Sequence, residues 1–187
     1  MRLLTCYVGL CVSTQLGAQT RDAPATPEIA ARRSLEALRV GDYLGAARSV
    51  HPERLRQTRV LFDSLLRSGK ASYIAQRIFQ LPDSQALLAL DDAAFTAGLF
   101  RFGWMLDGGD QSMRQFRGVE IVGTARQGRD TAHVVYRYTV PPDSLPLQSY
   151  NVRTLLRCGA GWCANMLGDM RSLYRLLAEP MRRVGPP

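Results

Sequence analysis

The sequence has little of the chemistry that metal sites need. Its 187 residues include four cysteines and two histidines, and only Cys158 and Cys163 lie beyond the first eleven residues of the chain. A zinc site normally takes four protein ligands, or three and a water molecule. His51 and His133 are distant in sequence from the cysteine pair and from each other. We therefore expect no metal site.

Two common catalytic motifs are also absent. The chain contains no Gly-x-Ser-x-Gly sequence, which presents the nucleophile of many serine hydrolases, and no Gly-x-x-x-x-Gly-Lys sequence, which holds nucleotide phosphates. Enzymes of these two classes are therefore not expected. No cofactor is predicted.

Lysine is almost absent, although the chain is basic. Lys70 is the only lysine among 24 basic side chains, the formal net charge is +8, and no run of arginines is longer than two. Guanidinium groups bind phosphates and carboxylates well, but proteins that bind nucleic acid usually carry a basic cluster or stripe. We expect no specific nucleic-acid partner, and we favour arginines on solvated faces over a dedicated anion-binding surface.

Long apolar runs are missing except at the N-terminus. Met1 and Arg2 precede a mostly apolar stretch, Leu3 to Leu16, which has the charged start and short apolar body of a secretory signal peptide. The stretch is shorter than the roughly 20 apolar residues of a membrane-spanning helix. We predict removal of residues 1–18, a flexible lead-in over 19–26, and export to the periplasm or the medium.

Two other interpretations of the N-terminus are less favoured. A buried N-terminal helix conflicts with the polar, proline-containing stretch that follows it, which is typical of a disordered terminus. A lipid anchor at Cys6 or Cys11 would need a small residue before the cysteine, and neither has one. No later segment is predicted to span a membrane.

Helical spacing of apolar residues dominates the first half of the chain. Thr26 and Pro27 begin a helix that Gly41 ends. A short helix is predicted from Asp42 to His51 and a third from Pro52 to Gly69. Segments 71–81 and 92–106 also have helical spacing, and a last helix is predicted over 170–177.

The spacing of apolar residues changes from a period of 3.6 residues to one of 2 residues after residue 109. Alternation over 119–125, 131–140 and 150–158 predicts strands with one apolar and one solvated face, which is typical of an antiparallel sheet. A short strand is predicted over 164–167. The predicted inward side chains are Val134, Tyr136, Tyr138, Tyr150 and Val152, and the predicted outward ones are His133, Arg137, Arg153 and Arg157.

The order of these elements predicts the fold class. Helices before strands indicate a single α+β domain over 27–180, in which N-terminal helices pack on a curved, mainly antiparallel sheet. A tail is expected over 181–187.

The remaining cysteines suggest a crosslink. Cys158 and Cys163 flank a glycine-rich link between two predicted strands, so a tight hairpin would set them opposite each other. In an oxidising compartment they would form a disulfide, which stabilises the fold by about 2 kcal/mol in the chain-entropy model because the loop is small. Two free thiols are the alternative.

The chain resembles the nuclear transport factor 2-like (SnoaL-like) superfamily. The resemblance rests on an opening helix, the run Gly41-Asp42-Tyr43-Leu44-Gly45-Ala46-Ala47 leading to His51-Pro52, and a last hairpin with Gly161-Trp162. It covers both ends of the predicted domain but not residues 70–110, so the resemblance implies a helical insertion there. Membership would imply a cone-shaped pocket between sheet and helices. It would not imply an activity, since one fold serves many functions.

Candidate site residues follow from the predicted interior. An acid–base enzyme would need an Asp, His or Tyr facing it, and the inward strand positions hold tyrosines but no carboxylate. The candidates for catalysis are therefore His51, Tyr136 and Tyr138. Strand tyrosines are also ordinary sheet residues, and a histidine before a proline more often caps a helix. The predicted ligand pocket comprises Tyr43, Trp104, Tyr136, Tyr138 and Tyr150.

Two functions from different classes remain. The first is an exported, non-catalytic module that holds a small apolar ligand in the cone, or a partner protein on an apolar patch of Phe100, Phe102 and Trp104. The second is a small acid–base enzyme of the isomerase, dehydratase or hydrolase type. The missing inward carboxylate favours the first. The oligomeric state is open, with a homodimer as one option.

Overall fold

Helices occupy the first half of the chain and strands the second. A computed structural model describes residues 23–67, 69–106, 116–140 and 150–178. The helices are α1 (Pro27–Arg39), α2 (Tyr43–Arg48), α3 (Pro52–Arg67), α4 (Ala71–Tyr73), the π-helical η1 (Ile74–Phe79), α5 (Ser84–Leu88), α6 (Asp92–Leu106) and α8 (Leu167–Ala178). The strands are β1 (Gly118–Gln127), β2 (Thr131–Thr139), β3 (Asn151–Cys158) and β4 (Gly161–Ala164). The predicted signal peptide and the tail lie outside the described residues.

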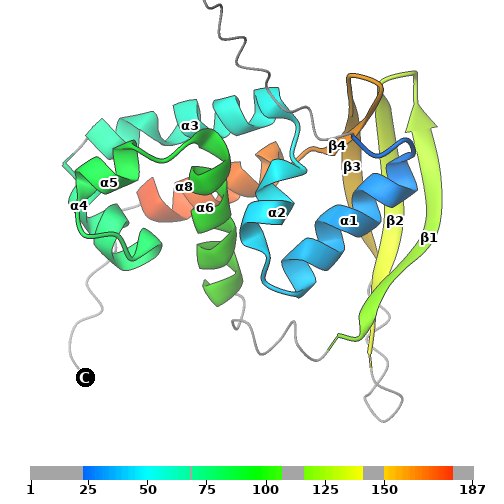
Figure 1. The fold of residues 1–187 in the computed structure, drawn as a ribbon, viewed down its shortest axis with the longest axis horizontal. Coiled ribbons are helices and arrows are strands. Elements are labelled where there is room, and N and C mark those ends of the chain that lie inside the picture. Colours follow the sequence, from blue (N-terminus) through cyan, green and yellow to red (C-terminus); the bar gives the residue numbers. More distant parts are fainter. Residues whose placement is uncertain (1–22, 68, 107–115, 141–149, 179–187) are drawn as a thin grey trace, which may run out of the picture.

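The strands form one antiparallel sheet in the order β1-β2-β3-β4, which does not close into a barrel. Helix α1 lies across one face of this sheet, and α2 lies between α1 and the other helices (Figure 1). The predicted α+β fold, with helices packed on an antiparallel sheet, is confirmed. The segment near 70–110 is helical as expected, but the five-residue α5 was not predicted.

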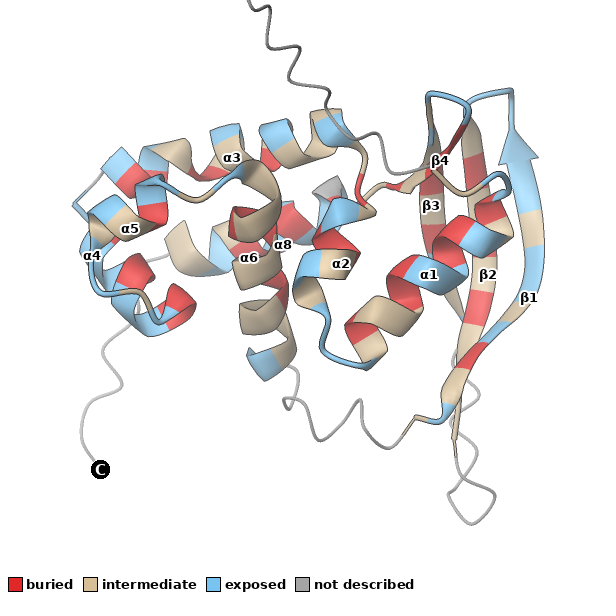
Figure 2. Cartoon of the chain, in the orientation of Figure 1, coloured by how far each residue is buried: buried red, intermediate tan, exposed pale blue. Residues whose placement is uncertain are grey.

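Polar side chains define where the helices begin. The Thr26 hydroxyl accepts a hydrogen bond from the Ile29 amide at the start of α1, and an Asp42 carboxylate oxygen accepts one from the Gly45 amide at the start of α2. These side chains occupy amide groups that have no partner within the helix. Helix α1 has a stripe of buried residues that includes Ala31 and Leu35, and buried positions along this helix are red in Figure 2.

Strand β2 faces the helices as predicted, but the faces of β3 were assigned backwards. Val134 and Tyr136 are buried. Arg153, however, is only 7 % exposed, whereas Tyr150 and Val152 are 57 % and 61 % exposed. The register explains this, because Val134 pairs with Arg153 and directly opposite residues share a face. The placement of Tyr150 and Val152 inward and of Arg153 outward was therefore wrong. His133 and Arg137 were placed correctly on the outer face. Arg157 was also placed outward, but it lies on the same face as Arg153, over the Trp162 ring, although the residue is exposed.

The last hairpin carries the disulfide. Cys158 and Cys163 are bonded, with their Cα atoms 5.9 Å apart, so the predicted crosslink is confirmed. They lie diagonally rather than directly opposite, because Cys158 pairs with Gly161. Strand β4 therefore spans Gly161–Ala164, three residues before the predicted 164–167.

The outer edge of β4 is covered by segments from the N-terminal half. The Trp162 amide donates to the Pro24 carbonyl, and the Ala164 amide donates to the Ser49 carbonyl. A Cβ atom at Gly161 would lie 2.4 Å from the Ala23 oxygen, so this position accommodates only glycine. Ala23 and Pro24 are thus part of the packed domain, which corrects the expectation of a flexible lead-in as far as residue 26. In the described part of the chain, no helix is long and apolar enough to cross a bilayer.

Candidate functional site

Two tyrosines project from β2 onto the side of the sheet that faces the helices. Tyr136 and Tyr138 are two residues apart, so they share a face of the strand, and their rings meet edge to face with centroids 5.6 Å apart. Phe116, just before β1, stacks on Tyr138 with a centroid distance of 4.8 Å. The structure therefore confirms the inward placement of both tyrosines.

Arg153 joins this pair from the neighbouring strand. Arg153 is only 7 % exposed, and one of its terminal nitrogens, Nη1, points at the sulfur of the buried Met166. A thioether is a weak acceptor. The Nε atom is buried and has no hydrogen-bond partner. Arg153, Tyr136 and Tyr138 are called the Arg153 corner below.

The carboxylates near the Arg153 corner do not pair with the arginine. Glu36 accepts hydrogen bonds from the Val119 amide and from Arg39 Nε, at 3.0 and 2.6 Å. Asp169 is exposed at the start of α8. Within the described residues, no ion pair joins Arg153 to a carboxylate. The guanidinium is thus a buried charge without a counter-ion there.

Burial keeps both tyrosine hydroxyls protonated. Desolvation raises the pKa of Tyr136 and of Tyr138 above the ordinary value of 10, although the charge of Arg153 acts in the opposite direction. The two hydroxyls also affect each other, which lowers the pKa of Tyr136 and raises that of Tyr138. The described residues of the Arg153 corner therefore supply hydrogen-bond donors, including the unpartnered Arg153 Nε, and no anion.

The other residues predicted to form a ligand pocket lie elsewhere. Tyr43 lines a shallow groove together with Phe79 and residues of α6. Trp104 is partly buried on α6, which lies beyond α2 from the sheet (Figure 1). Tyr150 is exposed and interacts with Arg137 on the outer side of the sheet. Of the predicted pocket residues, the structure brings together Tyr136 and Tyr138.

The histidines are occupied by structural contacts. His51 Nδ1 accepts a hydrogen bond from the Glu53 amide at the start of α3, and the His51 amide donates to the Ala164 carbonyl. His133 contacts the Thr154 hydroxyl and the Gln127 amide oxygen on the outer face. His51 is therefore the helix cap that such a sequence favours, rather than part of the Arg153 corner. In the described part of the chain, no cluster of three His, Cys, Asp or Glu residues is arranged to hold a metal.

Sequence reasoning missed Arg153 because both faces of β3 carry apolar residues, so alternation alone does not decide which face is buried. The available signal was the hairpin itself. A two-residue turn at Gly159 and Ala160 places Arg157 opposite Trp162 and Leu155 opposite Ala164. An inward Trp162 then requires an inward Leu155 and, two residues earlier, an inward Arg153.

Comparisons with known proteins give no family for this chain. No protein-family model, curated protein or solved structure matches it. The resemblance to the nuclear transport factor 2-like superfamily therefore stays a prediction.

Proposed function

We propose that this protein is an exported, non-catalytic binding module whose Arg153 corner holds a small organic anion, with the apolar part of the ligand against neighbouring core side chains. The observation that carries the proposal is the buried guanidinium of Arg153, which has no carboxylate partner among the described residues. The sequence predicted a small apolar ligand. The buried arginine indicates that the ligand also carries a negatively charged group.

Burial of an unpaired charge is costly. Removing one partner from a buried ion pair typically costs about 3–5 kcal/mol, because the remaining charge is uncompensated. A carboxylate removes this cost efficiently, since the planar guanidinium donates two parallel hydrogen bonds to it. Protonated Tyr136 offers a further donor at the same corner. The donors of the Arg153 corner therefore suit a carboxylate better than a neutral ligand.

Apolar side chains surround these donors. Phe116 stacks on Tyr138, and Ile121 packs partly buried beside Tyr136 as its cross-strand partner. Such a mixture of apolar walls and a few polar groups is typical of small-molecule sites. An open sheet covered by α1 also suits the proposed membership of the nuclear transport factor 2-like superfamily, whose members have their pocket on this side of the sheet.

Export rests on two observations. The N-terminal sequence has the pattern of a signal peptide, and a disulfide such as Cys158–Cys163 persists in oxidising compartments. We expect the intact mass of the secreted protein to lack residues 1–18 or 1–19. Recovery of a full-length chain from the periplasm or medium would contradict this part of the proposal.

An acid–base enzyme is the second candidate function. Two protonated tyrosines and a guanidinium are groups that stabilise a developing oxyanion, and this observation is what keeps the candidate open. Catalysis would also need a base. Glu36 is engaged by Arg39 and by a backbone amide, and His51 caps α3. The described residues facing the corner thus favour binding over catalysis.

Thermal denaturation with matched ligands tests the binding function. We would compare benzoate with benzamide and octanoate with octanamide, because each pair differs mainly in charge. At a concentration of about 100 times Kd, binding stabilises a protein by about 2.7 kcal/mol, which raises Tm by about 5–10 °C for a domain of this size. The acids should raise Tm and the amides should not.

The control separates the Arg153 corner from general charge attraction. Arg153→Met should abolish the response to the acid, whereas Arg137→Met, which removes the same charge from the outer face, should keep it. An equal response to acid and amide, or a full response in Arg153→Met, would overturn the proposed function.

A further inference from the structure

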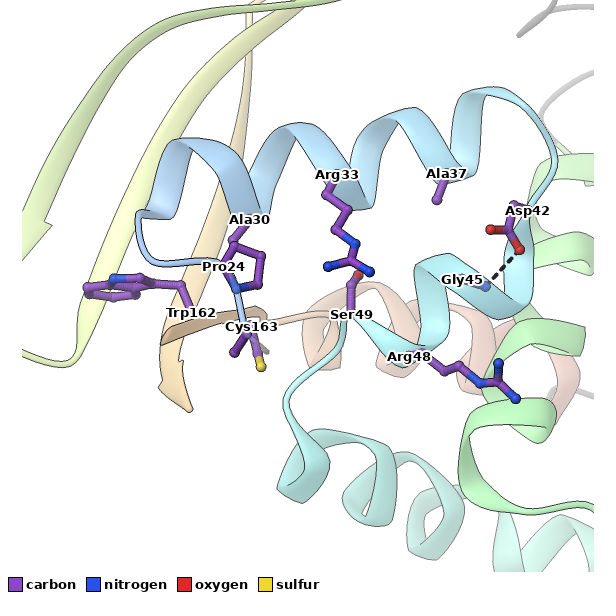
Figure 3. Close-up of a pocket in the computed structure, with 11 residues that line it drawn as sticks. Pro24, Ala30, Arg33, Ala37, Asp42, Gly45, Arg48, Ser49, Trp162 and Cys163 are labelled. Atoms are coloured by element: carbon purple, nitrogen blue, oxygen red, sulfur yellow. Dashed lines mark hydrogen bonds between the residues drawn. The ribbon is translucent and has the colours of Figure 1, made fainter. Parts of the chain in front are cut away.

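A separate pocket lies along α1, beside the outer edge of β4. Its volume is about 320 Å³, and residues of α1, α2, β4 and the N-terminal segment line it. Arg33 extends from α1 toward Ser49, whereas Arg48, at the end of α2, also lines the pocket but its side chain points away from Arg33 (Figure 3). Both arginines are exposed. None of the residues of the Arg153 corner lines this pocket.

The two arginines are available for a ligand. Neither Arg33 nor Arg48 makes an ion pair or a hydrogen bond within the described part of the chain. Asp42 is the carboxylate in the lining, and one of its oxygens accepts from the Gly45 amide at 2.8 Å. Two guanidinium groups against one engaged carboxylate give the pocket a net positive charge.

Close backbone packing fixes the walls. A Cβ atom at Gly45 would lie 2.0 Å from the Asp42 carboxylate, and one at Gly161 would lie 2.4 Å from the Ala23 oxygen. Position 161 therefore requires glycine, because the closest atoms are backbone, whereas a side chain at Gly45 would displace the Asp42 carboxylate from its cap. The Trp162 amide donates to the Pro24 carbonyl and closes the end of the pocket next to β4. A site with fixed walls loses less entropy on binding than a mobile surface does.

We infer that this pocket is a second binding site, which takes a small molecule bearing a carboxylate or phosphate group between Arg33 and Arg48. The guanidinium groups come from different helices and point apart in the ligand-free structure. Because Arg48 is exposed, its side chain can turn toward an anion bound at Arg33, so that the anion is held from two sides. Alanine and proline side chains in the lining, Ala30, Ala37 and Pro24, leave room for a short apolar part of the ligand. This inference does not depend on the function proposed for Arg153.

Backbone amide NMR with two probe anions tests the site. Inorganic phosphate and succinate would each be titrated into the Arg153→Met protein, so that the interior site does not contribute. We expect saturable shifts of the Gly45, Ser49 and Cys163 amides. Saturation with phosphate alone indicates a phosphate ligand and saturation with succinate alone a carboxylate ligand, and both support the site. No saturable shift with either probe would overturn it.

Matched variants separate the pocket from net charge. Arg33→Gln/Arg48→Gln should weaken binding by about 100-fold, since each charge-assisted hydrogen bond contributes roughly tenfold. Arg77→Gln/Arg175→Gln removes the same charge from exposed arginines outside the pocket and should change affinity by no more than about twofold. Equal losses in the two double variants, or no loss in the first, would overturn the inference. The single variants Arg33→Gln and Arg48→Gln repeat the test if the double variant does not fold.

Discussion

Replacement of Arg153 by methionine should stabilise the ligand-free protein. The arginine is 7 % exposed, its Nε has no partner, and its contact with Met166 is a weak one. Methionine has a similar length and needs no hydrogen bond. Replacing buried charges by apolar residues of similar volume is often neutral or stabilising by about 1–4 kcal/mol. For a domain of this size, a gain of about 2 kcal/mol raises Tm by about 4–8 °C.

The assay is denaturant unfolding of protein that has first been refolded without small anions, so that no bound ligand contributes. Wild type, Arg153→Met and Arg153→Ala would be compared. The alanine variant removes the charge but leaves a cavity, so it should be less stable than the methionine variant. If Arg153→Met is less stable than wild type by about 2 kcal/mol or more, Arg153 has a strong partner within the chain and the reasoning is refuted.

Three further predictions follow from packing and charge. Tyr136→Ala should lower the free energy of unfolding by about 3 kcal/mol or more because it empties a buried aromatic site, whereas Arg137→Ala should have a Tm near that of wild type, since it breaks an exposed ion pair. A lower Tm for Arg137→Ala than for Tyr136→Ala would contradict the faces assigned to β2. Serines in place of both Cys158 and Cys163 should lower the free energy of unfolding by about 2 kcal/mol, and urea titrations that match wild type would contradict this. Because burial raises the pKa of Tyr136 and of Tyr138, the free energy of unfolding that they contribute should be fully present below pH 10 and should fall as the pH rises above it. In urea unfolding, Tyr136→Phe/Tyr138→Phe should lose less stability at alkaline pH than wild type, and an equal loss would contradict the assignment of this pH dependence to the two tyrosines.

The parts of the fold that followed from sequence are those with one dominant pattern. Helix α1 has a cap at Thr26 and a mostly apolar buried stripe, and β2 alternates between buried and partly buried residues as far as Tyr136, so both were placed correctly. Helix α5 has only five residues, too few for a periodic signal. Segment 71–81 was predicted as a regular helix, but it is mostly π-helical and ends at Gln80, which has a left-handed φ of 56°.

Strand β3 shows why the candidate site was only partly predictable. Val152, Thr154 and Leu156 form one alternating set, and Arg153, Leu155 and Arg157 form the other. The cost of burying arginine favoured the first set as the inward one. Pairing with β2 and β4 favoured the second, since it puts Leu155 beside Ala132 and Ala164 in the core. Long-range pairing, which the strand's own sequence does not contain, decided the outcome.

Native mass spectrometry tests the central claim most directly. Protein taken from its natural compartment, without exposure to added organic acids, would be measured for wild type and for Arg153→Met, with Arg137→Met as the control. We predict a retained adduct in wild type and in the control, released by acid and identified as a small organic anion, and its absence from Arg153→Met. An adduct that is neutral, or one that Arg153→Met retains equally, would contradict the assignment of the Arg153 corner as the binding site.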